Sequence, residues 1–355
     1  MIRQLTGGIA GLTILTMSAP VAADTFTLRI GSGHPSGPSV YVTDVEKFFV
    51  PEVTRRVAEE TEHEVTFVEG YGGAIAGVSE TLEAVQNGIL DIGAYCMCFE
   101  PAKLFLHNFP YYAPFGPQES AQAMTATRAV YDQVPWLSEQ FESQYRQVML
   151  GLHGWDNYHV GTTEPWEAVA DLQGVKIGGA GPNLPWLEFA GAIPVQSTLP
   201  DGYLSLQTGV YNGWLMFPSA YLGFKFYEPS PYYTLVGFGA MPVNVLTMNA
   251  SSMQRLPEDL QQIIREVGRA YEDQAGTSLD TAQANGLKGL VAAGATVTEL
   301  APEARADWAA SLAGFAKLQA ADADGRNTPG TEVMSAFIAA VTATGYEWPV
   351  TYTLD

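Results

Sequence analysis

The residues best suited to catalysis or metal binding are few and scattered. The five histidines are His34, His63, His107, His153 and His159. His153 and His159 lie six residues apart on a predicted strand, a spacing that fits no common metal-ligand pattern. The chain lacks G-x-S-x-G, H-E-x-x-H and the glycine-rich phosphate and dinucleotide motifs. We therefore expect no cofactor, no metal and no enzyme activity; the alternative is an exported hydrolase, because Asp/Glu pairs assemble only in space.

Cys96 and Cys98 are the only cysteines. Side chains two residues apart on a strand point to the same face, and this close spacing gives poor disulfide geometry. We expect two buried thiols. The alternatives are a strained bridge and a metal pair, although no His or Cys stands at a recognisable zinc spacing.

The stretch from Asp171 to Glu228 forms one predicted α/β unit that ends in aromatic residues. A short buried strand is expected at 175–177, and the glycines after it let the backbone turn sharply. Helices are expected at 185–191 and 199–210. The segment Y-N-G-W-L-M-F-P follows, and then Tyr221, Phe224, Phe226 and Tyr227.

The first 23 residues have the pattern of a secretory signal peptide. Arg3 supplies a positive n-region, residues 8–17 an apolar h-region, and Val21-Ala22-Ala23 a small-residue cleavage site. We expect cleavage after Ala23 and a periplasmic protein; the alternative is an uncleaved anchor, although the apolar run is short for a membrane span of about 20 residues. The net charge of −21 argues against nucleic acid or anionic lipid as a partner, because such a surface repels polyanions.

Strand and helix patterns alternate along the chain, which predicts an α/β fold. Strands are expected at 26–30, 64–68, 89–94, 145–152, 235–239, 243–248 and 296–299, and helices at 41–61, 257–293, 302–320 and 330–343. Ligands of open α/β sheets sit at the carboxyl ends of strands, which places the loop with Ser32 and His34 near a potential cleft.

Several motifs, in this order, resemble the solute-binding proteins of TRAP (tripartite ATP-independent periplasmic) transporters. They are D-L-Q-G-V-K-I from Asp171, S-L-Q-T-G from Ser205, N-G-W-x-x-x-P from Asn212 and K-F-Y-E from Lys225. Gly70 to Gly77, Gly88 to Ile92, and Trp155-Asp156-Asn157 resemble further family segments. In the family an arginine follows K-I and clamps the ligand carboxylate, whereas this sequence has Gly178.

The resemblance implies a two-lobed periplasmic-binding-protein (clamshell) fold with a central ligand cleft. We expect residues 24–152, with part of 239–290, in lobe I, and residues 153–238, with part of 291–355, in lobe II. The implied partner is a TRAP membrane permease driven by an ion gradient. An ABC-type periplasmic binding protein is the alternative within the binding class.

The expected ligand-binding residues come mostly from motif position. They are His34, Tyr71, Tyr95, Glu100, Trp155, Asn157, Gly178, Asn183, Trp214, Phe217 and Tyr221. Lys103 is the other charge placed to enter the cleft, and either it or Glu100 could instead belong to a surface ion pair. Trp155 could likewise be a structural residue at a lobe crossing.

Gly178 removes the carboxylate clamp that the resemblance implies, while Trp214 and Phe217 replace polar anchors with aromatic faces. A carboxylate in a closed cleft needs a positive or multiply donating partner. Three ligand classes therefore stay open: an organic acid held in a non-standard way, an organic cation and a neutral apolar molecule. The hypothesis is an atypical, aromatic-lined site.

Overall fold

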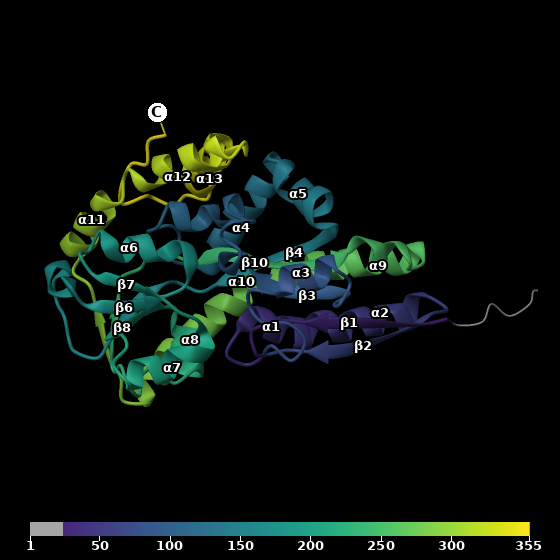
Figure 1. The fold of residues 1–355 in the computed structure, drawn as a ribbon, viewed down its shortest axis with the longest axis horizontal. Coiled ribbons are helices and arrows are strands. Elements are labelled where there is room, and N and C mark those ends of the chain that lie inside the picture. Colours follow the sequence, from purple (N-terminus) through teal and green to yellow (C-terminus); the bar gives the residue numbers. More distant parts are fainter. Residues whose placement is uncertain (1–23, 355) are drawn as a thin grey trace, which may run out of the picture.

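The computed structural model describes residues 24–354, in which two β-sheets lie side by side with helices around them (Figure 1). The predicted signal peptide, residues 1–23, lies outside the described residues. Among the residues that are described, no helix is long and apolar enough to cross a membrane.

The first sheet has five strands in the order β2-β1-β3-β10-β4. The strands are β1 (Thr25–Gly31), β2 (Glu64–Gly70), β3 (Ile92–Cys96), β4 (Gln147–Trp155) and β10 (Met241–Asn249). β1 is parallel to β2 and β3, whereas β10 is antiparallel to both β3 and β4. All residues of β3 and β10 are buried, as their apolar sequences require of strands covered on both faces.

Helices of the first part of the chain surround this sheet. They are α1 (Val40–Asp44), η1 (Val45–Phe49), α2 (Val50–Glu60), α3 (Thr81–Gln86), η2 (Met97–Phe99), η3 (Leu106–Tyr112), α4 (Ser120–Gln133) and α5 (Trp136–Tyr145). The single helix expected at 41–61 is divided by the π-helical segment η1. Pro51, at the start of α2, has no N–H to donate into the preceding turn, which fits this irregularity.

The second sheet has six strands in the order β11-β9-β5-β8-β6-β7. The strands are β5 (His159–Thr162), β6 (Lys176–Gly179), β7 (Ile193–Gln196), β8 (Gly213–Met216), β9 (Tyr232–Leu235) and β11 (Thr296–Glu299). β6 is parallel to β7 and β8, and β5 is antiparallel to β8 and β9. Its short helices are η4 (Val169–Leu172), η5 (Gly181–Asn183), α6 (Leu184–Glu188), α7 (Leu199–Gln207) and α8 (Pro218–Gly223).

The chain passes between the sheets at two neighbouring segments that are hydrogen-bonded to each other. One joins β4 to β5, and the other joins β9 to β10. The Tyr158 N–H donates to the Gly239 carbonyl at 3.1 Å, and the Phe238 N–H donates to the Tyr158 carbonyl at 3.1 Å. The strand expected at 235–239 is therefore wrong: β9 ends at Leu235, because Gly237 and Gly239 adopt φ of +72° and +104°, which strands do not use.

The long helix α10 (Glu258–Ala292) makes a third connection and lies along the junction of the sheets (Figure 1). It packs on β4 and α4 of the first sheet's side, and on α8 and β11 of the second. At Gly268 a Cβ would lie 2.7 Å from the Leu150 carbonyl oxygen, so this glycine lets the helix lie directly on β4.

The remaining helices are α9 (Ala250–Gln254), α11 (Pro302–Ser311), α12 (Phe315–Gly325) and α13 (Gly330–Ala343). The helix expected at 302–320 is therefore two helices. The break at 312–314 allows both Leu312 and Phe315 to be buried, and α13 then packs on α4 and α12.

The two cysteines form a disulfide, so the expectation of free buried thiols is wrong. Cys96 ends β3, but Cys98 lies in the 3-10 turn η2. This turn brings the Cα atoms to 5.1 Å, within bridging range, whereas residues two apart on a regular strand are separated by about 6.6 Å.

Within residues 24–354 no group of three or more His, Cys, Asp or Glu side chains could hold a metal ion.

Candidate functional site

A pocket lies where strands of both sheets end. β3 and β4 of the first sheet lead into Cys98, Phe99 and Trp155, while β6 and β8 of the second lead into Ala180 and Phe217. We call this the interlobe pocket. Its lining is Cys98, Phe99, Trp155, Tyr158, Ala180, Asn183, Leu199, Trp214, Leu215, Met216 and Phe217. Carboxyl ends of strands are the usual ligand position in α/β sheets.

The interlobe pocket is largely filled by its own aromatic side chains. Trp155, at the end of β4, stacks on Phe217, which follows β8, with ring centroids 4.7 Å apart and planes 18° apart. Tyr158 meets the same Phe217 ring edge-on at 5.1 Å. The remaining cavity has a volume of about 20 Å³, enough for roughly one water molecule. A ligand of ordinary size therefore requires the two aromatic rings to separate.

Two buried polar atoms in or beside this pocket have no hydrogen-bond partner among the described residues. The first is Asn183 Oδ1, in the pocket lining itself. The second is Nε2 of His34, whose ring lies against the lining residues Phe99 and Trp155 at 5.4 and 5.6 Å. Burial lowers the pKa of His34 to about 4, so this side chain is neutral at physiological pH.

The pocket lining contains no charged side chain among the residues that the structure describes. Glu100, predicted as a ligand contact, instead accepts a hydrogen bond from Lys103 Nζ at 3.1 Å, and Lys103 also bonds Glu83. Burial raises the pKa of Glu100. Glu100 and Lys103 therefore form an ion pair outside the lining.

Gly178 leaves the space that the Trp214 indole occupies. The two residues are paired neighbours on β6 and β8. A Cβ at Gly178 would lie 2.7 Å from Trp214 Cε3, closer than real contacts allow, and 3.0 Å from Tyr211 Cε2, which is tighter than most real contacts. Trp214 is also packed against Phe226, with ring centroids 5.2 Å apart. The Trp214 indole can therefore occupy this position only because residue 178 has no side chain.

Among the predicted site residues, the structure brings Trp155, Asn183, Trp214 and Phe217 into the lining, with His34 and Gly178 directly behind it. The other five predicted residues make internal hydrogen bonds outside the lining. Tyr71 donates to Glu69, Tyr95 to Gln147, Tyr221 to the Ser230 carbonyl and Asn157 Nδ2 to Gln118, while Glu100 bonds Lys103.

The prediction omitted seven lining residues: Cys98, Phe99, Tyr158, Ala180, Leu199, Leu215 and Met216. Phe99 and Tyr158 stand in aromatic segments directly after predicted strands, a signal that could have found them. The aliphatic ones carry no such signal.

Asp156 lies at the crossing between the sheets and is fully buried. Its carboxylate accepts hydrogen bonds from the Ser219 hydroxyl at 2.6 Å and the Ser219 N–H at 3.1 Å, which ties the crossing to α8. Burial raises the pKa of Asp156 to about 7, against the opposing effect of these bonds.

Replacing Asp156 by asparagine should change the pH dependence of folding. Because the pKa of Asp156 is higher in the folded than in the unfolded protein, its protonated form favours folding. This contribution is complete at pH values below the unfolded-state pKa and is lost as pH rises towards 7. We expect the free energy of unfolding of the wild type to fall relative to Asp156→Asn from pH 4 to 7 and then to stay level. Urea unfolding of both proteins at pH 4, 5.5, 7 and 8 measures this. A constant difference across that range would contradict the assignment.

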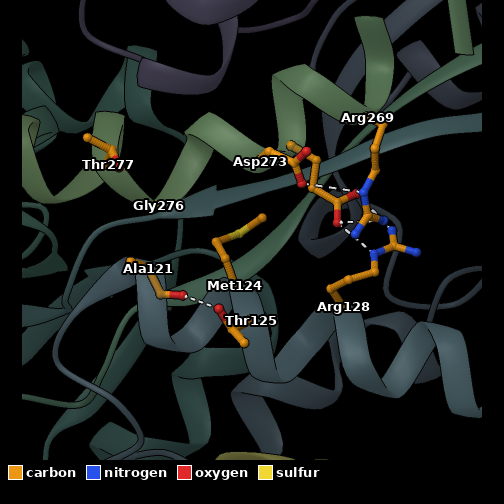
Figure 2. Close-up of a pocket in the computed structure, with 9 residues that line it drawn as sticks. Ala121, Met124, Thr125, Arg128, Arg269, Asp273, Gly276 and Thr277 are labelled. Carbon is orange, nitrogen blue, oxygen red and sulfur yellow. Dashed lines mark hydrogen bonds and ion pairs between the residues drawn. The ribbon is translucent and has the colours of Figure 1, made fainter. Parts of the chain in front are cut away.

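A second hollow lies between α4 and α10 (Figure 2). It has a volume of about 250 Å³ and includes Arg128, Arg269, Glu272 and Asp273. The arginines bond Glu272 and Asp273 at 2.6 to 3.4 Å. Because these charges satisfy one another, the hollow is a groove over an ion-pair network that joins two helices.

The sequence profile of the bacterial extracellular solute-binding proteins of family 7, DctP, matches residues 42–322, which is most of the chain. The chain belongs to this family. Members of the DctP family are periplasmic solute-binding proteins of TRAP transporters, so the resemblance seen in the motifs is confirmed. Neither this family nor its fold is that of an enzyme.

Solved TRAP solute-binding proteins share the fold of this DctP-family chain. One from Rhodoferax ferrireducens, in complex with copurified benzoate, has a TM-score of 0.80 at 18% identity, with 90% of this chain and 98% of that one covered. Another, from a marine metagenome, is described as specific for aromatic acids and holds 3-hydroxybenzoate; its TM-score is 0.80 at 21% identity, with 91% and 100% covered. These likenesses confirm the expected two-lobed α/β architecture.

A third relative, from Bordetella bronchiseptica, was solved with (R)- and (S)-mandelate. Its TM-score is 0.76 at 20% identity, with 89% of this chain and 99% of that chain covered.

Proposed function

We propose that this DctP-family protein captures a small organic solute in the interlobe pocket and delivers it to a TRAP-type membrane permease. The observation that carries the proposal is the interlobe pocket itself, where aromatic side chains from both sheets meet and one amide oxygen lacks a partner. Relatives with the same fold hold benzoate, 3-hydroxybenzoate or mandelate. Binding is proposed without chemical conversion of the solute.

The proposed lobes meet at this pocket. Residues 24–152, with part of 239–290, form lobe I, and residues 153–238, with part of 291–355, form lobe II. The two crossings and α10 are the connections that would bend as the lobes open and close. The proposal includes export to the periplasm with removal of a signal peptide after Ala23.

A ligand that binds only the native protein should raise its melting temperature. At a concentration 100 times its Kd, a ligand adds about 2.7 kcal/mol to the free energy of unfolding. A thermal-shift screen of organic acids, amines and neutral aromatics would find such a ligand, and small-angle scattering should show compaction on its addition. Phe217→Ala should abolish the shift, whereas the matched change Phe189→Ala, at a half-exposed ring outside the lining, should leave it unchanged.

Delivery is tested separately, by solute uptake into vesicles that contain the permease. Uptake should require this protein and an ion gradient. Dependence on ATP hydrolysis would instead support an ABC-type system, and turnover of the bound solute would support the hydrolase alternative.

A further inference from the structure

The interlobe pocket offers nothing that would neutralise a charged ligand. No described residue in its lining is charged. The buried carboxyl groups of Glu100 and Asp156 lie outside the lining: Glu100 Oε2 pairs with Lys103 while its Oε1 has no partner among the described residues, and Asp156 accepts from Ser219. The neighbouring histidine, His34, is held neutral by burial. A buried ion without a counter-charge is strongly disfavoured.

The Trp155–Phe217 stack is a contact that a flat molecule can replace. Residues on the first sheet's side fix the Trp155 ring. Tyr41 meets the indole edge-on at 5.1 Å, and the indole Nε1 donates to Cys96 Sγ at 3.5 Å. Phe217 belongs to the second sheet's side. Opening the lobes therefore exposes two parallel aromatic faces, between which a planar ring can bind with one face on each.

Asn183 supplies the polar contact for such a ring. The residue is 1% exposed and lines the pocket, and its Oδ1 has no hydrogen-bond partner among the described residues. A buried acceptor without a partner is costly, so a ligand that donates to Oδ1 removes an existing penalty.

The geometry points to an uncharged planar aromatic solute that carries an N–H or O–H donor, bound between Trp155 and Phe217 with its donor on Asn183 Oδ1. This inference rests on the proposed function and narrows its ligand class. Lys103 is excluded as the group that binds a ligand carboxylate, because its ammonium group is already paired with Glu83 and Glu100. An organic cation is excluded because no free carboxylate lies in the lining.

Three probes of nearly identical shape separate the charge classes: benzoate, benzamide and benzamidinium. Titration calorimetry with the whole mature protein at pH 7.5 should give a Kd for benzamide about 100-fold or more below the other two, because only benzamide avoids burying an unpaired charge. Acetophenone, which is neutral but has no donor, should bind about 5- to 10-fold more weakly than benzamide. Tighter binding of benzoate or benzamidinium would overturn the inference and leave the proposed function standing.

Variants at Asn183 test the hydrogen bond. Asn183→Leu should bring the benzamide Kd up to that of acetophenone without changing the acetophenone Kd. Asn183→Ala, which is less demanding sterically, should do the same. Asn285→Leu, on the exposed side of α10, is the matched control and should change neither Kd. Equal losses for both ligands in both Asn183 variants would make Asn183 a packing residue and overturn its assigned role.

Failure of all three probes to bind would also overturn the inference, since the pocket would then not accept a ring. The wider thermal-shift screen still tests the proposed function in that case. A shift with a non-aromatic solute would uphold solute binding, whereas no shift with any class would count against both.

Discussion

Replacing Glu272 by alanine should lower the free energy of unfolding by about 3–5 kcal/mol, the usual cost of removing one partner from a buried ion pair. The Glu272 carboxylate is only 4% exposed and accepts from Arg128 Nε at 2.6 Å and Nη2 at 2.8 Å. It also accepts from the Leu152 N–H of β4 at 2.9 Å. One carboxylate thus joins α10, α4 and the first sheet, and its loss leaves Arg128 largely buried without its main partner.

The neighbouring Asp273→Ala is the matched control. Asp273 also pairs with an arginine, Arg269, at 3.4 Å, but its side chain is 66% exposed (Figure 2). Exposed pairs contribute about 0–1 kcal/mol, so the control should unfold close to the wild type. Chemical unfolding at pH 7.5 measures both variants. Similar small losses for the two would show that the network has little energetic weight.

Introducing an arginine at Gly178 should destabilise the protein by about 3 kcal/mol or more, since it overpacks the site and buries a charge. The reason is Trp214: its Cε3 atom would lie 2.7 Å from the new Cβ, and the sheet fixes both backbones. One substitution therefore does not restore the carboxylate-binding arginine that the resemblance implies at this position.

The double variant Gly178→Arg/Trp214→Ala should recover part of that stability, because removing the indole makes room for the arginine. It should also bind benzoate about 100-fold more tightly than the wild type does, since a guanidinium pairs well with a carboxylate. Trp214→Ala alone is the control, and it should lose stability, as large-to-small core changes do, without gaining benzoate affinity. If Gly178→Arg were as stable as the wild type, Trp214 would not require a glycine at position 178, and this explanation would be wrong.

The sequence alone determined the α/β class and most strand and helix positions. These follow from local patterns, such as the alternation in β1, the apolar run of β10 and the helical pattern of α13, which short-range physics governs. Four of the residues predicted mostly from motif position, Trp155, Asn183, Trp214 and Phe217, also lie in the lining.

Only the tertiary structure decided which aromatic and polar side chains leave the pocket. Tyr95 lies on β3 like the residues leading to the lining, yet its hydroxyl turns to Gln147, 52 positions later in the chain. Asn157 follows Trp155 closely, but its amide bonds Gln118 and the Gly239 N–H. A side chain takes the partner that satisfies it in three dimensions, and such long-range partners leave no local pattern.

The same reason explains the filled pocket and the disulfide. Trp155 and Phe217 are 62 positions apart, and their stack exists because two sheets meet at strand ends. Cys96 and Cys98 are bridged because the chain turns at η2, which a regular-strand reading of their spacing could not include. The sequence showed that Gly178 stands where the resemblance implies an arginine. Only the pairing of β6 with β8 showed that the Trp214 indole occupies the adjacent space, since register decides which side chains share a face.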